Sequence, residues 1–567
     1  MDVKFAYLGR SSFQRAATGD QLRLLPNLAR EPVSFDAPLL QPVRFREAIS
    51  ALHDVVINDL RYQPRDHTAY QEWKKSEAER EGAFRRQMYE QVKQEILAKR
   101  ETPVPVDLES RYRACRGKYW NARQEYSNYL RLHDMDLWRK LMPCDPIVTV
   151  ADDVLFFECF SADESSYGCL TVDREGTFGR SETLQLGTTN VDYSWDLYHH
   201  FQALRTYRET RFRVDPQGFE VAVASRPDYR EEKIDLPQGW LRGLMQVQVA
   251  MGMPTRRVSL SREAAYSLLA WLKRHRARKS PRAIRFELLA GKSPRMILEP
   301  WEQPIESLGT RYDGPNSEPV RVWGGRRLLV LARILPLLDG LDVYLLGTGL
   351  PSFWVARMGA MRLTLGLSGW TTNDWTHGSA LDLLAPPVAI TADVVQRVTD
   401  GMRRRRLATL DDIVRETQVS VAQCAAALHR LANAGQLIYD LAGHSYRWRQ
   451  IMPTALGEAE LGPENAEAVA AKEIVSRRRV AVESDERPTE GLRLLKAKVE
   501  NQPVELLLDA DGTIKRGHCL CGHHRRAGLR MGPCRHLLAL RAFSTPASDS
   551  PATLESWFEK LRKWSNN

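Results

Sequence analysis

Long apolar runs are absent from this sequence of 567 residues. The richest apolar stretch, LLVLARILPLLDGLDVYLLG, is interrupted by Arg333, Pro336, Asp339 and Asp342, whereas a helix that spans a bilayer needs about 20 apolar residues in succession. The opening residues, MDVKFAYLGRSSFQR, contain no apolar segment as long as that of a signal peptide. We therefore expect a cytoplasmic protein with no membrane partner.

Cysteine is also scarce, with eight residues in the whole chain. Small secreted domains carry a dense and even set of cysteines that pair as disulfides. Most of the cysteines here are instead scattered, which is typical of thiols in the reducing cytosol. The scattered residues are Cys115, Cys144, Cys159, Cys169 and Cys424.

Common catalytic motifs are missing as well. The segment GTGLPS lacks the Lys and the Ser or Thr of a P-loop, and neither GxSxG nor HExxH occurs. No pair of carboxylates stands in a recognisable catalytic pattern. We therefore expect a protein that is not an enzyme.

The composition is that of a folded protein, with 43% hydrophobic and 27% charged residues. A chain of this length exceeds what one core needs, so several domains are expected. The net charge of +10 comes from 81 basic and 71 acidic residues. This surplus is modest for the length, and local clusters of charge are therefore more informative than the total.

Two long helices are predicted in the N-terminal region, residues 1–145. Residues 66–102 are almost free of Gly and Pro, and Pro103 and Pro105 end this stretch. A second, aromatic-rich helical pattern covers residues 108–141, so a short connection gives an antiparallel hairpin. Its many charges fit a solvated face better than a partner-binding coiled coil, because no heptad is sustained.

The body, residues 146–390, is rich in predicted strands and contains a candidate β-α-β-β repeat. Such units also arise by coincidence, so the repeat is one of two interpretations. The two clearest copies cover residues 257–260, 261–275, 283–289 and 295–298, and then 320–323, 326–338, 343–346 and 353–367. A weaker copy covers residues 183–186, 195–207, 211–214 and 219–223.

Residues 391–453 resemble a winged helix-turn-helix. Thr409 with Asp412 and Ser420 with Gln423 each have the form of a capping box. Two predicted strands, 437–441 and 445–449, follow the second helix. In members that bind DNA, the second helix enters the major groove and the wing contacts phosphates.

Contacts to DNA from this segment would come mainly from arginines, because its second helix is rich in alanine. Arg447 and Arg449 on the wing, and the run 403–406, are the candidate phosphate ligands. A winged helix that only docks onto protein is an equally weighted alternative.

A metal site is predicted near the C-terminus. Cys519-x-Cys521 is followed by twelve residues and then by Cys534-x-His536. Three thiolates and one imidazole complete a tetrahedron around Zn²⁺ and leave no position for water, so the metal would be structural. PVELLLDADGTIKRGHC predicts two strands, and RHLLALRAF predicts a helix that carries His536.

This CxC and CxH pattern in a β-β-α frame resembles the SWIM zinc finger of bacterial proteins. The resemblance implies Zn²⁺ bound by Cys519, Cys521, Cys534 and His536, although His518, His523 and His524 lie close enough to compete. It also implies binding to DNA or to protein. The segment LLGTGLPSFWVARMGAMRLTLGLSGWTTNDW is similar to bacterial SWIM proteins often encoded beside MoxR-type AAA+ ATPases and von Willebrand A domain proteins.

Basic residues gather around the finger, and residues 512–548 contain no acidic residue. Such a surface suits nucleic-acid phosphates, but it suits an acidic protein surface equally well. The candidate nucleic-acid ligands here are Lys515, Arg516, Arg525, Arg526, Arg530 and Arg535.

The chain is therefore predicted to be a multidomain α+β protein. Beyond the winged helix we expect a linker at 454–488, the finger at 489–545 and a tail at 546–567. The favoured function is a non-enzymatic zinc protein that binds nucleic acid through its finger and winged helix. The alternative is an adaptor that docks on a MoxR-type AAA+ ATPase.

Overall fold

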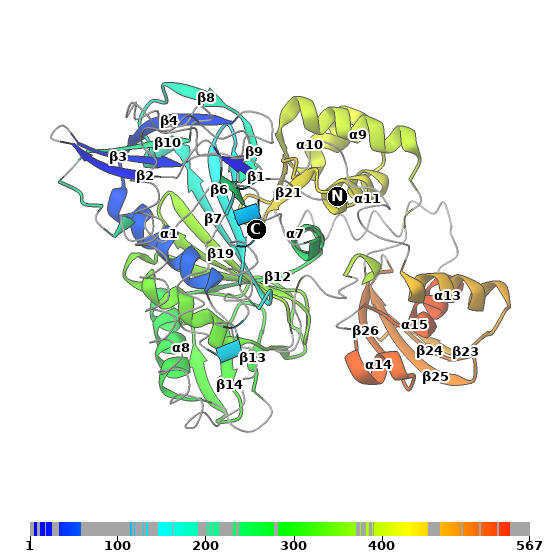
Figure 1. Cartoon of the computed structure of the whole chain (residues 1–567). Helices are drawn as coiled ribbons and strands as arrows, with labels where there is room; N and C mark the ends of the chain where they lie inside the picture. The colour runs from blue at the N-terminus through cyan, green and yellow to red at the C-terminus, as the bar shows by residue number, and fades with distance from the viewer. Residues whose placement is uncertain are drawn as a thin grey trace. The chain divides into compact units, whose positions relative to one another are not determined.

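The computed structural model describes most of the chain outside the predicted helical hairpin (Figure 1). The described residues are 5–7, 12–16, 19–24, 33–57, 146–161, 163–190, 201–202, 204–207, 209–214, 231–233, 238–276, 282–369, 381–384, 390–451, 465–488, 492–509, 512–529 and 532–544, with isolated residues elsewhere.

The chain divides into two compact units, one of residues 1–58 with 143–567 and the other of residues 59–142. The predicted helix at 66–102 lies outside the described residues. Within the predicted helix at 108–141, isolated residues such as Arg111, Cys115 and Leu132 are helical. The expected domain of residues 1–145 differs from this division, because residues 1–58 belong to the larger unit.

An eight-stranded antiparallel sheet forms the centre of the body. Its order is β12 (Arg256–Leu260), β17 (Gly340–Leu345), β18 (Ser352–Met358), β19 (Met361–Leu367), β7 (Ser166–Asp173), β6 (Val154–Phe160), β5 (Ile147–Val150) and β9 (Gly187–Asn190). The run VLFFECF in β6 is buried throughout, as expected for a strand covered on both faces.

Helices cover both faces of this sheet. Helix α1 (Pro42–Val56) packs against β6, β7 and β19 (Figure 1), and Phe45 of α1 meets Phe157 of β6 edge to face. Residues of α7 (Gln238–Met251) share a core with Phe156 and Phe160 of β6. Successive side chains of β6 therefore serve two different layers, because neighbouring side chains of a strand point to opposite faces.

A four-stranded antiparallel sheet adjoins α8 (Arg262–Arg274), in the order β15 (Gln303–Glu306), β14 (Arg295–Leu298), β13 (Ile284–Glu287) and β16 (Val320–Val322). The first candidate β-α-β-β stretch has its elements where predicted, as β12, α8, β13 and β14. In the second, residues 326–338 form 3₁₀ turns, η1 (Gly325–Arg333) and η2 (Leu335–Leu337), in place of an α-helix. Pro336 disfavours an α-helix that runs through residues 326–338, because its ring clashes with the carbonyl four residues earlier.

The repeat itself stays a prediction. The first stretch gives β12 to the eight-stranded sheet and two strands to the four-stranded sheet. The second stretch gives β16 to the four-stranded sheet, while β17, β18 and β19 join the eight-stranded sheet. Of the weaker copy, β8 (Thr183–Gln185) and β10 (Thr210–Val214) are strands. Most of residues 195–207, and all of 219–223, lie outside the described residues.

Near the N-terminus a five-stranded sheet has the order β2 (Ser12–Ala16), β3 (Gly19–Leu24), β10, β4 (Ser34–Leu39) and β8. Strand β10 pairs with β3 in parallel and with β4 antiparallel. A separate pair joins β1 (Phe5–Tyr7) to β11 (Glu231–Lys233).

Residues 390–451 form three helices and a small sheet. The helices are α9 (Ala392–Arg405), α10 (Leu410–Thr417) and α11 (Val421–Asn433), and the strands β20 (Leu407–Ala408), β22 (Ser445–Trp448) and β21 (Leu437–Asp440) lie side by side in that order. Thr409 and Asp412 form the predicted capping box. Ser420 accepts a hydrogen bond from the Gln423 amide. Helix α11 packs against α9, α10 and α7.

The C-terminal domain has a four-stranded antiparallel sheet, β23 (Val480–Glu486), β24 (Leu492–Val499), β25 (Gln502–Asp509) and β26 (Ile514–Cys519). Its helices are α13 (Ala466–Ser476), α14 (Gly522–Ala527) and α15 (Arg535–Ser544). Helix α15 packs against α13 and the sheet (Figure 1). The approach is close at Gly517, where an added Cβ would stand 2.8 Å from Leu537.

The expected linker at 454–488 therefore contains regular structure. Helix α13 and strand β23 fall within it, and β23 pairs with β24 along the edge of the finger's sheet. The expected finger boundary at residue 489 cuts this sheet, because β23 and β24 belong to one hydrogen-bonded ladder. The expected tail at 546–567 lies outside the described residues. Within the described part of the chain, no helix is long and apolar enough to cross a bilayer.

Candidate metal centre

Four predicted ligands converge in the C-terminal domain. Cys519 ends β26, Cys521 is the N-cap of α14, and Cys534 and His536 lie at the start of α15. Their ligand atoms all lie within 4.8 Å of one another. Cys519, Cys534 and His536 are buried, and Cys521 is half-buried. This arrangement can hold a metal ion.

The spacing of these atoms fits a tetrahedral ion. The Sγ of Cys519 lies 3.6 Å from Nδ1 of His536. Tetrahedral Zn²⁺ has Zn–S near 2.3 Å and Zn–N near 2.0–2.1 Å, which places sulfur and nitrogen about 3.5–3.6 Å apart. The donors are thiolates and an imidazole, which favour a soft or borderline ion over Ca²⁺ or Mg²⁺.

Backbone amides stabilise negative charge on the sulfur atoms. The Cys521 amide donates to Sγ of Cys519 at 3.5 Å, and the His524 amide donates to Sγ of Cys521 at 3.4 Å. A hydrogen bond from the Cys534 thiol lowers the pKa of Cys519 well below its ordinary value, and the same contact raises the pKa of Cys534. One thiolate thus forms readily, whereas a second beside it needs a cation to balance the charge.

Glu500 lies beside the metal centre and was not identified from the sequence. It lies in the turn between β24 and β25, and its Oε2 is 3.7 Å from Nε2 of His536. The Nδ1 atom of the same ring faces Cys519. A carboxylate beside the second nitrogen of a metal-bound histidine orients the ring and raises its basicity. No spacing rule links Glu500 to His536, since only folding brings them together.

The three competing histidines lie outside this cluster. His518 is exposed on β26, and Nε2 of His523 lies 3.4 Å from the Gly532 carbonyl oxygen. Burial lowers the pKa of His524. Among the described residues, the group of donors placed to hold a metal contains His536 and none of these three.

The predicted phosphate ligands of the finger differ in how exposed they are and in whether a carboxylate pairs with them. Lys515 pairs with Asp509 at 3.1 Å, and Arg535 with Glu467 at 2.6 Å. Arg516 is 55% exposed and lies 3.6 Å from Glu505. Arg525 and Arg526 are exposed on α14. Arg530 lies outside the described residues.

The two wing arginines are not available to nucleic acid. Arg447 is 6% exposed and pairs with Asp153 at 2.6 Å and with Asp440 at 3.2 Å. Arg449 is 1% exposed and pairs with Glu158 at 3.0 Å. The expectation that these side chains hold DNA phosphates is wrong in this fold, because both guanidinium groups face the body.

Most arginines in the run at the end of α9 also contact other side chains of the protein. Arg404 and Arg405 both pair with Glu416. The guanidinium carbon of Arg403 lies 5.1 Å from the centre of the Trp448 ring. Arg406 is exposed, and it makes no ion pair with another described residue.

Comparisons with known proteins give little further guidance. No family model matches the chain, and no curated protein matches it. Among solved structures, the proliferating cellular nuclear antigen of Entamoeba histolytica matches with 13% identity and a TM-score of 0.27, covering 41% of this chain and 91% of that one. A TM-score this low does not establish a common fold.

Proposed function

We propose that the C-terminal domain is a zinc-binding module of the SWIM type. The observation that carries this proposal is the convergence of Cys519, Cys521, Cys534 and His536 within 4.8 Å. Four protein donors leave no coordination position for water or substrate, so the ion would stabilise the fold without taking part in a reaction. The function proposed for the whole protein is accordingly binding, with no enzymatic step.

The proposed ligand of this module is nucleic acid, held by its phosphates. Arg516 on β26 and Arg525 and Arg526 on α14 are exposed. Residues 512–548 contain no carboxylate of their own, although Arg516 lies 3.6 Å from Glu505 of the neighbouring strand. Phosphate contacts release counterions from the nucleic acid, and this release would supply most of the affinity.

A salt titration of full-length protein tests this proposal, with fluorescence anisotropy of labelled duplex and single-stranded DNA. Replacing Arg525 and Arg526 together by Gln should weaken binding and, on duplex DNA, flatten the plot of log K against log salt by about 0.9 for each phosphate no longer neutralised. Lys496→Gln, which removes an exposed lysine of β24, is the matched control. Absence of salt-sensitive binding in the wild type would exclude nucleic acid as the ligand.

The segment 391–453 supports the second candidate function, an adaptor. If it is a winged helix, α11 would be the helix that reads DNA. That helix packs against α7 of the body, and the Tyr439 amide beyond it donates to Gln248 of α7 at 2.8 Å. A segment docked in this way fits a role in protein assembly better than one in the major groove.

The proposed partner in that case is a MoxR-type AAA+ ATPase, on the strength of the resemblance alone. The test is a direct binding measurement between the full chain and such an ATPase from the same genome. Binding that persists with the Arg525→Gln, Arg526→Gln variant would favour the adaptor, whereas no binding would leave nucleic acid as the better candidate.

A further inference from the structure

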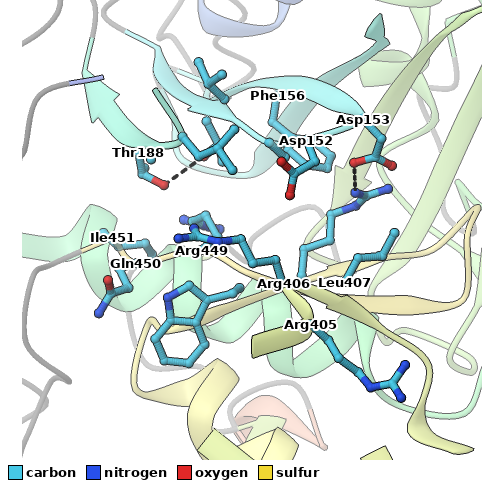
Figure 2. Close-up of a pocket in the computed structure, with 17 residues that line it drawn as sticks. Asp152, Asp153, Phe156, Thr188, Arg405, Arg406, Leu407, Arg449, Gln450 and Ile451 are labelled. Atoms are coloured by element: carbon cyan, nitrogen blue, oxygen red, sulfur yellow. Dashed lines mark hydrogen bonds and ion pairs between the residues drawn. The ribbon is translucent and has the colours of Figure 1, made fainter. Parts of the chain in front are cut away.

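A pocket of about 420 Å³ lies between the body and the segment of residues 390–451, where β22 ends (Figure 2). One wall comes from β5, β6 and β9, and the other from residues 405–407 and 447–451. This volume falls within the range of about 300–1,000 Å³ that is usual for small-molecule sites. The pocket is separate from the metal centre, because none of its lining residues belongs to the C-terminal domain.

Arg449 is the central polar group of this pocket. Its side chain is fully buried and its Nη2 donates to Oε1 of the equally buried Glu158 at 3.0 Å. The same Oε1 accepts a hydrogen bond from the Tyr167 hydroxyl at 2.7 Å. Two further nitrogens of Arg449, Nε and Nη1, are buried and have no hydrogen-bond partner among the described residues.

Buried donors without partners are rare, because such groups lose their hydration and gain nothing in return. The charge of Arg449 is balanced by Glu158, but its remaining hydrogen-bonding capacity is not used. A guanidinium presents its N–H groups in a fixed fork that matches the oxygens of a carboxylate or a phosphate. Oε2 of Glu158 is likewise buried without a partner, so this ion pair leaves two donors and one acceptor unused. The two donors of Arg449 are suited to the oxygens of an oxyanion.

Arg406 adds positive charge to the same pocket. It is exposed, lines the pocket and makes no ion pair with another described residue. Figure 2 shows Arg406 and Arg449 extending into the space beneath the strands that carry Thr188 and Phe156. The Oγ1 atoms of Thr149 and Thr188 lie 3.1 Å apart on the opposite wall.

Negative and apolar groups restrict what can bind. Asp153 is neutralised by Arg447, whereas Asp152 is exposed at the pocket and would repel a second negative group. Phe156 and Trp448 line the pocket as well and provide apolar surface for the rest of a ligand. A polyphosphate or a nucleic-acid backbone fits this combination poorly.

We propose that this pocket binds a small organic molecule through one oxyanion, a carboxylate or a phosphate, held by Arg406 and Arg449. This site is independent of the proposed zinc module and its ligand. It would make the protein responsive to a metabolite of this class, at a contact between the segment of residues 390–451 and the body.

Calorimetric titration of the full-length protein with inorganic phosphate, and separately with acetate, tests the site. We expect saturable binding of at least one probe, and about 10-fold or greater weakening by Arg406→Ala, since a charge-assisted hydrogen bond is removed. The probe that binds more tightly identifies the oxyanion. Arg404 is an exposed arginine two positions before Arg406 and does not line the pocket, so Arg404→Ala should bind the probe as the wild type does.

Arg449 needs a paired variant, because its loss alone would leave Glu158 buried without a partner. In Arg449→Met, Glu158→Gln both charges are removed, and we expect binding to be lost while the melting temperature stays close to that of the wild type. The variant Arg525→Gln, Arg526→Gln should bind the probe normally. Absence of saturation up to about 10 mM, or equal weakening by Arg404→Ala, would overturn the proposal.

Discussion

Replacing one ligand of the metal centre should release the ion and loosen one part of the chain. Cys534 is the most informative position, because it is fully buried and precedes α15. A serine there keeps the size of the side chain but removes the thiolate. Cys115→Ser is the matched control, since Cys115 is an exposed cysteine that does not belong to the cluster.

The expected loss of stability in Cys534→Ser follows from mass action. An ion present at about 1,000 times its dissociation constant stabilises the state that binds it by about 4.1 kcal/mol. If the serine raises the dissociation constant about 1,000-fold, roughly 0.4 kcal/mol of this remains, so the loss is near 4 kcal/mol. Leu495, Leu506 and Leu537 of the C-terminal domain belong to a large buried cluster that continues into the body. We therefore expect local opening near the site before the whole sheet unfolds.

Hydrogen exchange followed by mass spectrometry can measure this opening, together with metal analysis of the same samples. Wild type and Cys115→Ser should carry one zinc per chain. In Cys534→Ser, peptides covering β26, α14 and α15 should exchange up to about 1,000-fold faster, which corresponds to the loss of about 4 kcal/mol. Peptides of the eight-stranded sheet should not change. A Cys534→Ser protein that retains one tightly bound zinc and normal protection would refute the ligand assignment.

Three further changes test other parts of the fold. Burial lowers the pKa of His429 to about 4 from 6.5. The neutral ring therefore favours folding above pH 6.5, and this contribution, at most about 3 kcal/mol, is lost as the pH falls toward 4. The free energy of unfolding of His429→Gln, measured at several pH values, should be less sensitive to acid. Arg449→Met alone should destabilise by about 3–5 kcal/mol, because Glu158 is left charged and buried, and adding Glu158→Gln should restore most of this in thermal unfolding. Gly517→Ala should lower the denaturant midpoint by an amount equivalent to about 1–3 kcal/mol, since its Cβ would stand 2.8 Å from Leu537; an unchanged midpoint would show that α15 can shift.

Local signals in the sequence were sufficient for the metal cluster and for several helix starts. The capping box of Thr409 and Asp412 involves residues three positions apart, so a helix start can be recognised without the rest of the fold. The four ligands are similarly compact in sequence, from Cys519 to His536. For such features the chain itself supplies the proximity that the chemistry needs.

Contacts between distant segments could not be predicted in this way. Arg449 and Glu158 are separated by 291 positions, and from sequence alone an arginine on a hairpin is as consistent with a DNA contact as with a buried ion pair. The strand β23 had the same difficulty, because most of its residues are exposed and resemble a polar linker until β24 is placed beside it. Pairing partners of this kind depend on topology, which short-range patterns do not encode.

The place of β4 and α1 in the body has a consequence for how the chain is made. Asp36 of β4 binds Arg213 of β10, which is synthesised 177 residues later, and Cys159 reaches α1 across 107 residues. At about 5–20 residues per second, the first of these intervals is roughly 9–35 s. Until residues 157 and 178 have been made, Phe45 and Phe35 lack the rings of Phe157 and Phe178 that they contact in the fold. The nascent N-terminal segment thus exposes apolar side chains during synthesis, and the body completes its core only after the whole of residues 59–142 has been translated.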